Sequence, residues 1–173
     1  MKSEYGAKLV RKDFDGWNEL KKNLNSKNDP PQFKSSEIWW CSIGVNVGFE
    51  EDGKNENFER PVLIVRKYNK DLFVGLPMTS ILKDNKFHYR LPDYKGSKSM
   101  VILSQPRVLS SNRLLRRVQF LDDKIFRDLM DKFTTLTLEK AKPPRVAGES
   151  RTANAGLYYN SSKVVKKSQG GRV

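Results

Sequence analysis

The stretch Arg60 to Tyr68 (RPVLIVRKY) decides the fold class. Four apolar residues follow Arg-Pro without interruption, which is typical of a central strand of a sheet. Pro61 has no N–H to donate, so we expect it at the start of this strand. After a short turn at Asn69-Lys70, the segment Asp71 to Ser80 (DLFVGLPMTS) predicts the partner strand, which Pro77 should end.

Further short strands are predicted on both sides of this pair. Glu37 to Val45 (EIWWCSIGV) is aromatic and β-branched, as a buried strand should be. The polar, acidic segment from Asn46 to Glu59 predicts a loop. The other predicted strands are Phe87–Pro92, Met100–Val108 and Arg116–Phe120. Many short strands separated by turns indicate a strongly bent, small barrel.

A helix is predicted near each end of the strand region. Near the N-terminus, the predicted helix has Asp13 or Asp15 as its N-cap. Its apolar face is formed by Phe14, Trp17, Leu20 and Leu24, which recur at helical spacing. We expect this leader helix to pack on the barrel. The second helix runs from Leu121 to Phe133, with Asp122 as its N-cap.

The length of 173 residues indicates one domain with extensions. We divide the chain into an N-terminal helical extension (1–35), a barrel domain (36–138) and a tail (139–173). The tail is rich in Pro, Gly, Ser and Asn and holds 8 basic and 2 acidic residues, so it is predicted to be disordered. The net charge of +13 favours a polyanionic partner, nucleic acid first.

Several function classes are disfavoured. With one cysteine and one histidine, the chain offers no disulfide, no zinc motif and no pancreatic-type pair of histidines. Cys41 is expected to be a core residue. No phosphate-binding glycine motif is present, so we expect no cofactor. No apolar run approaches about 18 residues, so no membrane span is expected, and a reducing cytoplasm fits.

RNA cleavage has a route that needs neither two histidines nor a metal. The 2′-hydroxyl attacks the adjacent phosphate, so the substrate supplies its own nucleophile. The protein must align the attack, neutralise charge on the phosphorane and manage two protons. An arginine and a hydroxyl at strand ends can do much of this, because arginine presents forked donors to phosphate oxygens.

The order EIWWCSIG, RPVLIV, LPMTS and MVILSQPRV resembles the MazF/PemK/Kid toxins over roughly residues 36–136. The resemblance implies a mainly β fold: an SH3-like β-barrel of the CcdB/MazF type, with an N-terminal and a C-terminal helix. It also implies a homodimer that cleaves single-stranded mRNA sequence-selectively. The implied partners are a cognate antitoxin protein and, for the toxin-antitoxin complex, operator DNA.

The resemblance also implies site residues. By position, Arg60 and Thr79 are the catalytic candidates, Ser80 lies beside Thr79, and Gln105 with Arg107 matches a QxR pair near the binding groove. Further RNA-binding candidates are Phe87, His88, Arg113 and Arg116. Some relatives carry an Arg and an Asp where this chain has Ile102 and Ser104.

Each candidate also has a plainer interpretation. Arg60 could be a surface residue paired with Glu59 or Glu50, and the hydroxyl residues after Pro77 could be turn residues. His88 and Phe87 could be structural, and the basic cluster around Arg116 could be a solvated turn. Of Trp39 and Trp40, one should be core.

Two other functions remain open. A non-catalytic barrel of the same superfamily could bind nucleic acid, or a gyrase-like protein target. Alternatively, the basic tail could be the nucleic-acid binder and the barrel its scaffold.

Overall fold

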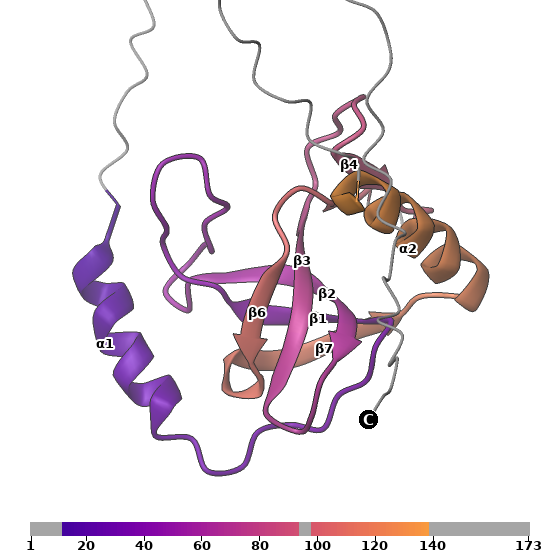
Figure 1. The fold of residues 1–173 in the computed structure, drawn as a ribbon. Helices are drawn as coiled ribbons and strands as arrows, with labels where there is room; N and C mark the ends of the chain where they lie inside the picture. Colours follow the sequence, from indigo (N-terminus) through magenta and orange to yellow (C-terminus); the bar gives the residue numbers. More distant parts are fainter. Residues whose placement is uncertain (1–11, 94–97, 139–173) are drawn as a thin grey trace, which may run out of the picture. The chain divides into compact units, whose positions relative to one another are not determined.

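The computed structural model describes residues 12–93 and 98–138. The chain divides into two units, Met1–Glu139 and Lys140–Val173. The tail that we predict to be disordered therefore lies outside the described residues. Within the first unit, the described residues form one seven-stranded sheet with two α-helices (Figure 1).

Strand β2 (Glu59–Lys67) lies between β1 (Glu37–Ser42) and β3 (Leu72–Thr79), and both neighbours are antiparallel to it. The predicted pairing of the two central segments is therefore present. Pro77 does not end β3, which continues to Thr79. Pro77 lies between residues 72–75, which pair with β6, and residues 78–79, which pair with β5. Its missing N–H thus interrupts neither of these ladders.

The prediction of a single strand over Met100–Val108 is wrong. The structure has two strands there, β5 (Met100–Ile102) and β6 (Arg107–Ser110), and both pair with β3. The chain turns between them, over 103–106, so one long strand receives two short partners. The main path of paired strands is β4 (His88–Arg90), β5, β3, β2, β1 and β7 (Leu114–Phe120), and β6 pairs with β3 outside this path.

The sheet separates two hydrophobic clusters, and β2 contributes to both. Leu63 and Val65 belong to the cluster that includes Leu129 of helix α2 (Asp123–Leu138). Val62 and Ile64 belong to the other cluster. Alternate side chains of a strand point to opposite faces, so a strand buried on both sides needs an uninterrupted apolar run. Helix α2 also extends beyond the predicted end at Phe133.

Helix α1 (Phe14–Asn25) begins where the sequence predicts, and the Asp13 side chain accepts a hydrogen bond from Gly16 N at 2.9 Å. Trp17 and Leu24 are buried, but Phe14 is about half exposed. The Trp17 ring packs against the Phe58 ring, with centroids 5.7 Å apart. The leader helix therefore packs on the strand region, as predicted, although Phe14 is not part of its buried face.

Candidate active site

Arg60 and Thr79 come from neighbouring strands, close to the ends of β2 and β3. The register sets Val62 opposite Pro77, and the same register continued by two residues sets Arg60 opposite Thr79. Arg60 Nη1 donates to the carbonyl of Met78, the residue before Thr79, at 2.9 Å. The two residues predicted to be catalytic therefore lie together.

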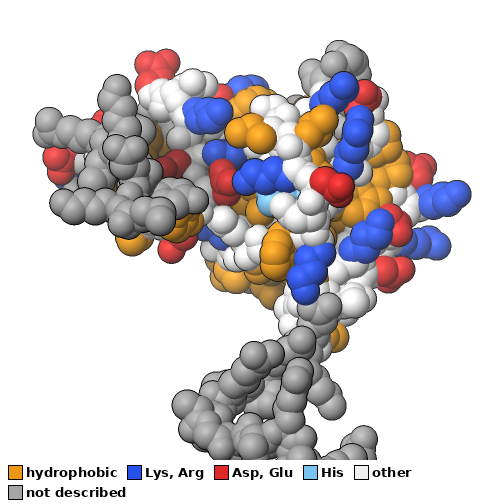
Figure 2. Space-filling model, turned by 90° about the horizontal axis from the view of Figure 1, so that it is seen from above, with side chains coloured by type: hydrophobic (Ala, Val, Ile, Leu, Met, Phe, Trp, Pro, Cys, Tyr) orange, Lys and Arg blue, Asp and Glu red, His pale blue; other side chains and the backbone are white. Residues whose placement is uncertain are grey.

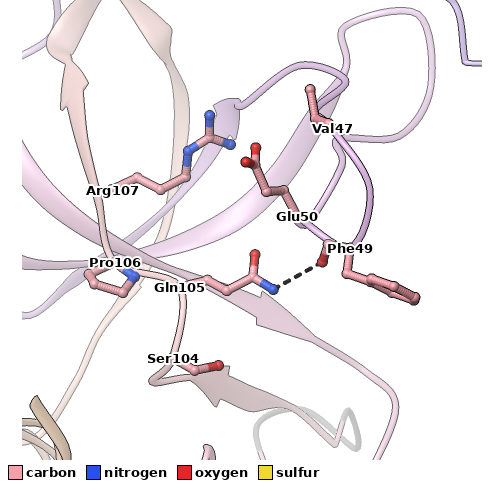
Figure 3. A pocket seen from close by; sticks show the side chains of 7 residues that line it. All are labelled: Val47, Phe49, Glu50, Ser104, Gln105, Pro106 and Arg107. Carbon is pink, nitrogen blue, oxygen red and sulfur yellow. Dashed lines mark hydrogen bonds between the residues drawn. The ribbon is translucent and has the colours of Figure 1, made fainter. Parts of the chain in front are cut away.

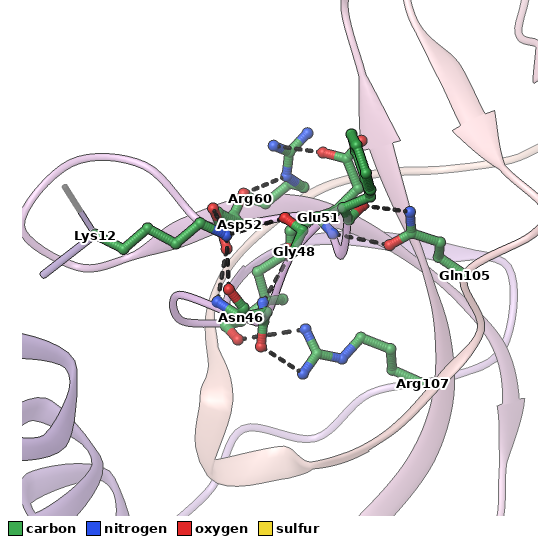
Figure 4. A network of polar contacts seen from close by, with 10 residues as sticks. Lys12, Asn46, Gly48, Glu51, Asp52, Arg60, Gln105 and Arg107 are labelled. Atoms are coloured by element: carbon green, nitrogen blue, oxygen red, sulfur yellow. Dashed lines mark hydrogen bonds and ion pairs between the residues drawn. The ribbon is translucent and has the colours of Figure 1, made fainter. Parts of the chain in front are cut away.

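The loop between β1 and β2 holds the other edge of the Arg60 guanidinium. Its Nη2 pairs with Glu51 Oε2 at 2.7 Å, and its Nε donates to the Asp52 carbonyl at 2.7 Å (Figure 4). The partner is thus neither Glu59 nor Glu50. The Arg60 side chain is only 11% exposed, so the contact is a partly buried, charge-assisted one. Glu51 occupies donors that a phosphate would otherwise use.

Thr79 takes part in a local turn. Its Oγ1 accepts a hydrogen bond from the N–H of Ile81 at 3.2 Å, as in the turn-residue interpretation. Because the hydroxyl accepts in this contact, its own proton remains available for a phosphate oxygen. Ser80 follows Thr79 and is exposed.

Gln105, in the segment between β5 and β6, and Arg107, the first residue of β6, hold the same loop. Gln105 Oε1 accepts from Glu51 N at 2.8 Å, and its Nε2 donates to the Phe49 carbonyl at 3.2 Å. Arg107 Nη2 donates to Asn46 Oδ1 at 3.0 Å (Figure 4). Both residues of the QxR pair are therefore contacts of the loop that contains the partner of Arg60.

A pocket of about 660 Å³ lies between this loop and that segment (Figure 3). The Phe49 side chain is fully exposed, and the Glu50 carboxylate points toward the Arg107 guanidinium. An exposed aromatic ring can stack on an unpaired base. The lining residues are Val47, Phe49, Glu50, Ser104, Gln105, Pro106 and Arg107.

Phe87 and His88 lie elsewhere. His88 lines a second pocket, of about 490 Å³, with residues of α2. Burial, and then the charge of Lys83, lower the pKa of His88, while the charge of Glu51 opposes them. Phe87 is 42% exposed, with the Lys86 ammonium 5.6 Å from its ring centre. Neither residue lines the pocket beside the β1–β2 loop, so their role in RNA binding stays a prediction.

Arg113 and Arg116 also have other partners. Arg113 Nη1 donates to the Ser42 carbonyl at 3.0 Å, and its guanidinium lies 5.2 Å from the Trp17 ring centre. Arg116 forms two 2.8 Å hydrogen bonds with the buried carboxylate of Glu59. The structure does not bring either arginine to Arg60, and their predicted contacts with RNA remain predictions.

Arg116 also stacks 4.7 Å above the Trp40 ring. Trp40 is partly exposed, whereas Trp39 is buried and donates to Glu37 Oε2 at 2.7 Å. One of the two tryptophans is thus core, as predicted. Cys41 is buried as well, and burial raises the pKa of its thiol to about 12, which leaves it unreactive.

The residues that arrange the loop are not apparent from the sequence. Lys12, Asn46, Glu51 and Asp52 all contact one another or Arg60. The one signal in the sequence is the Glu-Glu-Asp run shortly before Arg60, since an acidic run near a candidate phosphate-binding arginine is a potential partner for it.

Over residues 12–93 and 98–138, no three side chains of His, Cys, Asp or Glu come together as a metal site. None of the described helices has the length and apolar character needed to cross a membrane.

A family model described as PemK-like, MazF-like toxin of type II toxin-antitoxin system matches residues 34–137, which is more than half of the chain. This chain belongs to that family. The resemblance drawn from the sequence is therefore confirmed, and the protein is a MazF-like toxin of a type II toxin-antitoxin system. No curated protein sequence matches the chain.

A solved structure of the family has the same fold. MazF (Form-I) from Deinococcus radiodurans is 22% identical, with a TM-score of 0.52, and the match covers 64% of this chain and 98% of that one. A second match is MazE-MazF (Form-II) from the same organism, at 20% identity, TM-score 0.48, and coverage of 64% and 97%. The expected barrel-like fold of the CcdB/MazF type is confirmed, although the path of paired strands does not close on itself: it begins at β4 and ends at β7.

Proposed function

We propose that this toxin is an endoribonuclease that cuts single-stranded mRNA in the cytoplasm without a metal. The observation that carries the proposal is the position of Arg60. Its guanidinium is nearly buried, lies opposite Thr79 and adjoins the loop that lines an open pocket. Such a site holds the guanidinium in a fixed position, and a phosphate that displaces Glu51 from Nη2 meets a preorganised donor.

The proposed reaction is an attack by the 2′ oxygen on the adjacent phosphorus. A P–O bond forms to the 2′ oxygen while the bond to the 5′ oxygen breaks, which leaves a cyclic phosphate and a 5′-hydroxyl. Arg60 and Thr79 donate to the non-bridging oxygens. When a phosphate takes Nη2 of Arg60, the Glu51 carboxylate is released and can accept the 2′-hydroxyl proton. A water molecule from solvent protonates the 5′ oxygen as the bond to phosphorus breaks.

One face of the molecule carries the side chains that a single strand needs. Lys and Arg side chains lie among hydrophobic side chains on the face seen from above in Figure 2. Single strands bind where cations follow the backbone and apolar rings receive the bases. Phe49, which is fully exposed beside the pocket, is the proposed base-stacking residue.

The proposed partners follow from the family. A type II toxin has a cognate antitoxin, and one solved relative is a MazE-MazF complex. We propose an antitoxin partner for this chain, a homodimer as its working form, and operator DNA as a ligand of the toxin-antitoxin complex. Residues 36–138 would form the nuclease domain, with 1–35 as extension and 139–173 as tail.

The test compares two arginines of β2. In EDTA, wild-type protein should cut a single-stranded RNA and leave a 2′,3′-cyclic phosphate end. Arg60→Lys should lower kcat about 100-fold or more, since one donor fork is lost from the transition state. Arg66→Lys should cleave at the wild-type rate, because Arg66 is exposed at the other end of the strand.

RNA that is bound by the wild type but stays intact would reject the nuclease proposal and favour the non-catalytic barrel. Equal activity of the Arg60 and Arg66 variants would show that Arg60 is not part of the active site.

A further inference from the structure

Lys12 reaches from the N-terminal extension into the loop between β1 and β2. Its Nζ lies 2.6 Å from the Asn46 carbonyl, 3.3 Å from the Gly48 carbonyl and 2.8 Å from Asp52 Oδ2 (Figure 4). The Lys12 and Asp52 side chains are only 23% and 30% exposed. The ion pair is therefore partly shielded from water, which makes it stronger than a fully exposed pair.

The acceptors of Lys12 lie along the segment 46–52 of the loop. Asp52 Oδ1 also accepts the N–H of Asn46 at 2.6 Å, and Asn46 Nδ2 donates to the Glu51 carbonyl at 2.7 Å. Lys12 and Asp52 thus close the segment 46–52 into a compact ring.

The opposite side of this ring faces the proposed active site. Asp52 contacts Lys12 through its carboxylate and Arg60 through its carbonyl, and Glu51 pairs with Arg60 directly. Val47, Phe49 and Glu50 of the same ring line the pocket. Lys12 is therefore one residue away from Arg60 in a continuous series of contacts.

Helix α1 sets the position of Lys12. Trp17 is buried beside Phe58, and Asn112 Nδ2 donates to the Leu24 carbonyl at 3.1 Å near the other end of the helix. Both ends of α1 are attached to the strand region. Lys12, which directly precedes the N-cap, is therefore held at a fixed position beside the loop.

We propose that Lys12 is a positioning residue for RNA binding: it braces the segment 46–52 as one preformed wall of the pocket. The expected change in KM rests on the proposed function, whereas the expected change in the mobility of the segment 46–52 does not. Without the brace, RNA would have to order the segment itself, and ordering a loop on binding lowers affinity. The N-terminal extension would thereby determine substrate affinity although it does not touch the reacting phosphate.

The test replaces Lys12 with methionine in the full chain and measures two quantities. Amide hydrogen exchange of residues 46–53 should become at least tenfold faster, while residues 62–65 of β2 keep their protection. In RNA cleavage, KM should rise at least fivefold and kcat should stay within twofold. The matched control is Lys22→Met, which removes the same charge from α1 but breaks only an exposed pair with Glu19.

A double-mutant cycle separates the ion pair from general damage. Lys12→Met combined with Asp52→Asn should speed exchange of the loop no more than Lys12→Met alone, because both substitutions remove the same ion pair. Unchanged exchange of 46–53 in Lys12→Met would overturn the proposal, whether or not the protein cuts RNA. Faster exchange with unchanged KM, in protein that does cut, would overturn the positioning role alone.

Discussion

At the scale of single residues, three arginines each pair with a particular glutamate. Arg60 pairs with Glu51, whereas Arg116 and Arg117 of β7 pair with the buried carboxylates of Glu59 and Glu37. A buried carboxylate needs such partners, since leaving it unpaired is costly. Some of the arginines therefore stabilise the fold, so an arginine in this sequence does not by itself indicate an RNA-binding surface.

His88 is the chain's one histidine, so its titration can be followed directly. Because burial and then Lys83 lower its pKa below the usual 6.5, the folded protein holds this ring neutral at pH 7. Protonation favours the unfolded chain, so stability present above pH 6.5 is lost as the pH falls toward the folded-state pKa.

We expect the single imidazole NMR resonance to titrate with a midpoint below 6.5. Lys83→Met should move that midpoint upward, while Lys70→Met, which removes a charge from the β2–β3 turn, should not. A midpoint at or above 6.5 in the wild type would contradict the assignment of burial as the main cause.

At the scale of elements, the central strands were predictable because their signal is local. The run Val62–Val65 identifies a strand buried on both faces, and the register then places Arg60 beside Thr79. The break at 103–106 contains Pro106, which has no N–H for a ladder and is the one signal of it in the sequence. The residues on each side are equally suited to a strand, which is why the pattern predicts a single strand. The break depends on β3, which pairs with β5 at one end and β6 at the other.

The contacts of Arg60 were not predictable for a related reason. They depend on the path of the loop, which takes positive φ values at Gly44, Gly48, Asn55 and Phe58. Asn and especially Phe give little indication of such a conformation. The resemblance indicates the arginine, but only the folded loop shows that Glu51 is its partner.

Two glycines of this region allow a test of how α1 is attached. Gly44 and Gly48 both have positive φ, +87° and +58°, but a Cβ at Gly44 would lie 2.2 Å from the Trp17 ring, whereas a Cβ at Gly48 would meet nothing within 4 Å. Alanine at either position introduces backbone strain of about 1 kcal/mol. Only Gly44→Ala also displaces Trp17.

We therefore expect Gly44→Ala to lower the free energy of unfolding by about 2–4 kcal/mol and Gly48→Ala by about 1 kcal/mol, as measured by urea denaturation. Tryptophan fluorescence should show that the Trp17 indole is more exposed to water in Gly44→Ala than in the wild type. Equal decreases in the two variants would mean that Trp17 does not anchor the helix.

At the scale of the whole molecule, the basic tail and the strand region can be separated by truncation. A chain that ends at Glu139 keeps the first compact unit and lacks 8 Lys and Arg residues. Its urea midpoint should match that of the full chain. RNA affinity at low salt should fall, and its salt dependence should become shallower by about 0.7 in the log–log slope for each phosphate that the tail no longer neutralises.

Cleavage itself should survive the truncation. Complete abolition of RNA binding would instead identify the tail as the nucleic-acid binder and the barrel as its scaffold.

The pairing of β1 has a consequence for how the chain is made. Trp39 pairs with Val62, which follows soon in the chain, and also with Arg117, which follows much later. The second pairing is a long-range closure, and such closures form slowly. Since synthesis proceeds from the N-terminus, β7 and then α2 emerge after every other described element. The ribosome must therefore have translated every described strand before the toxin can complete its own sheet.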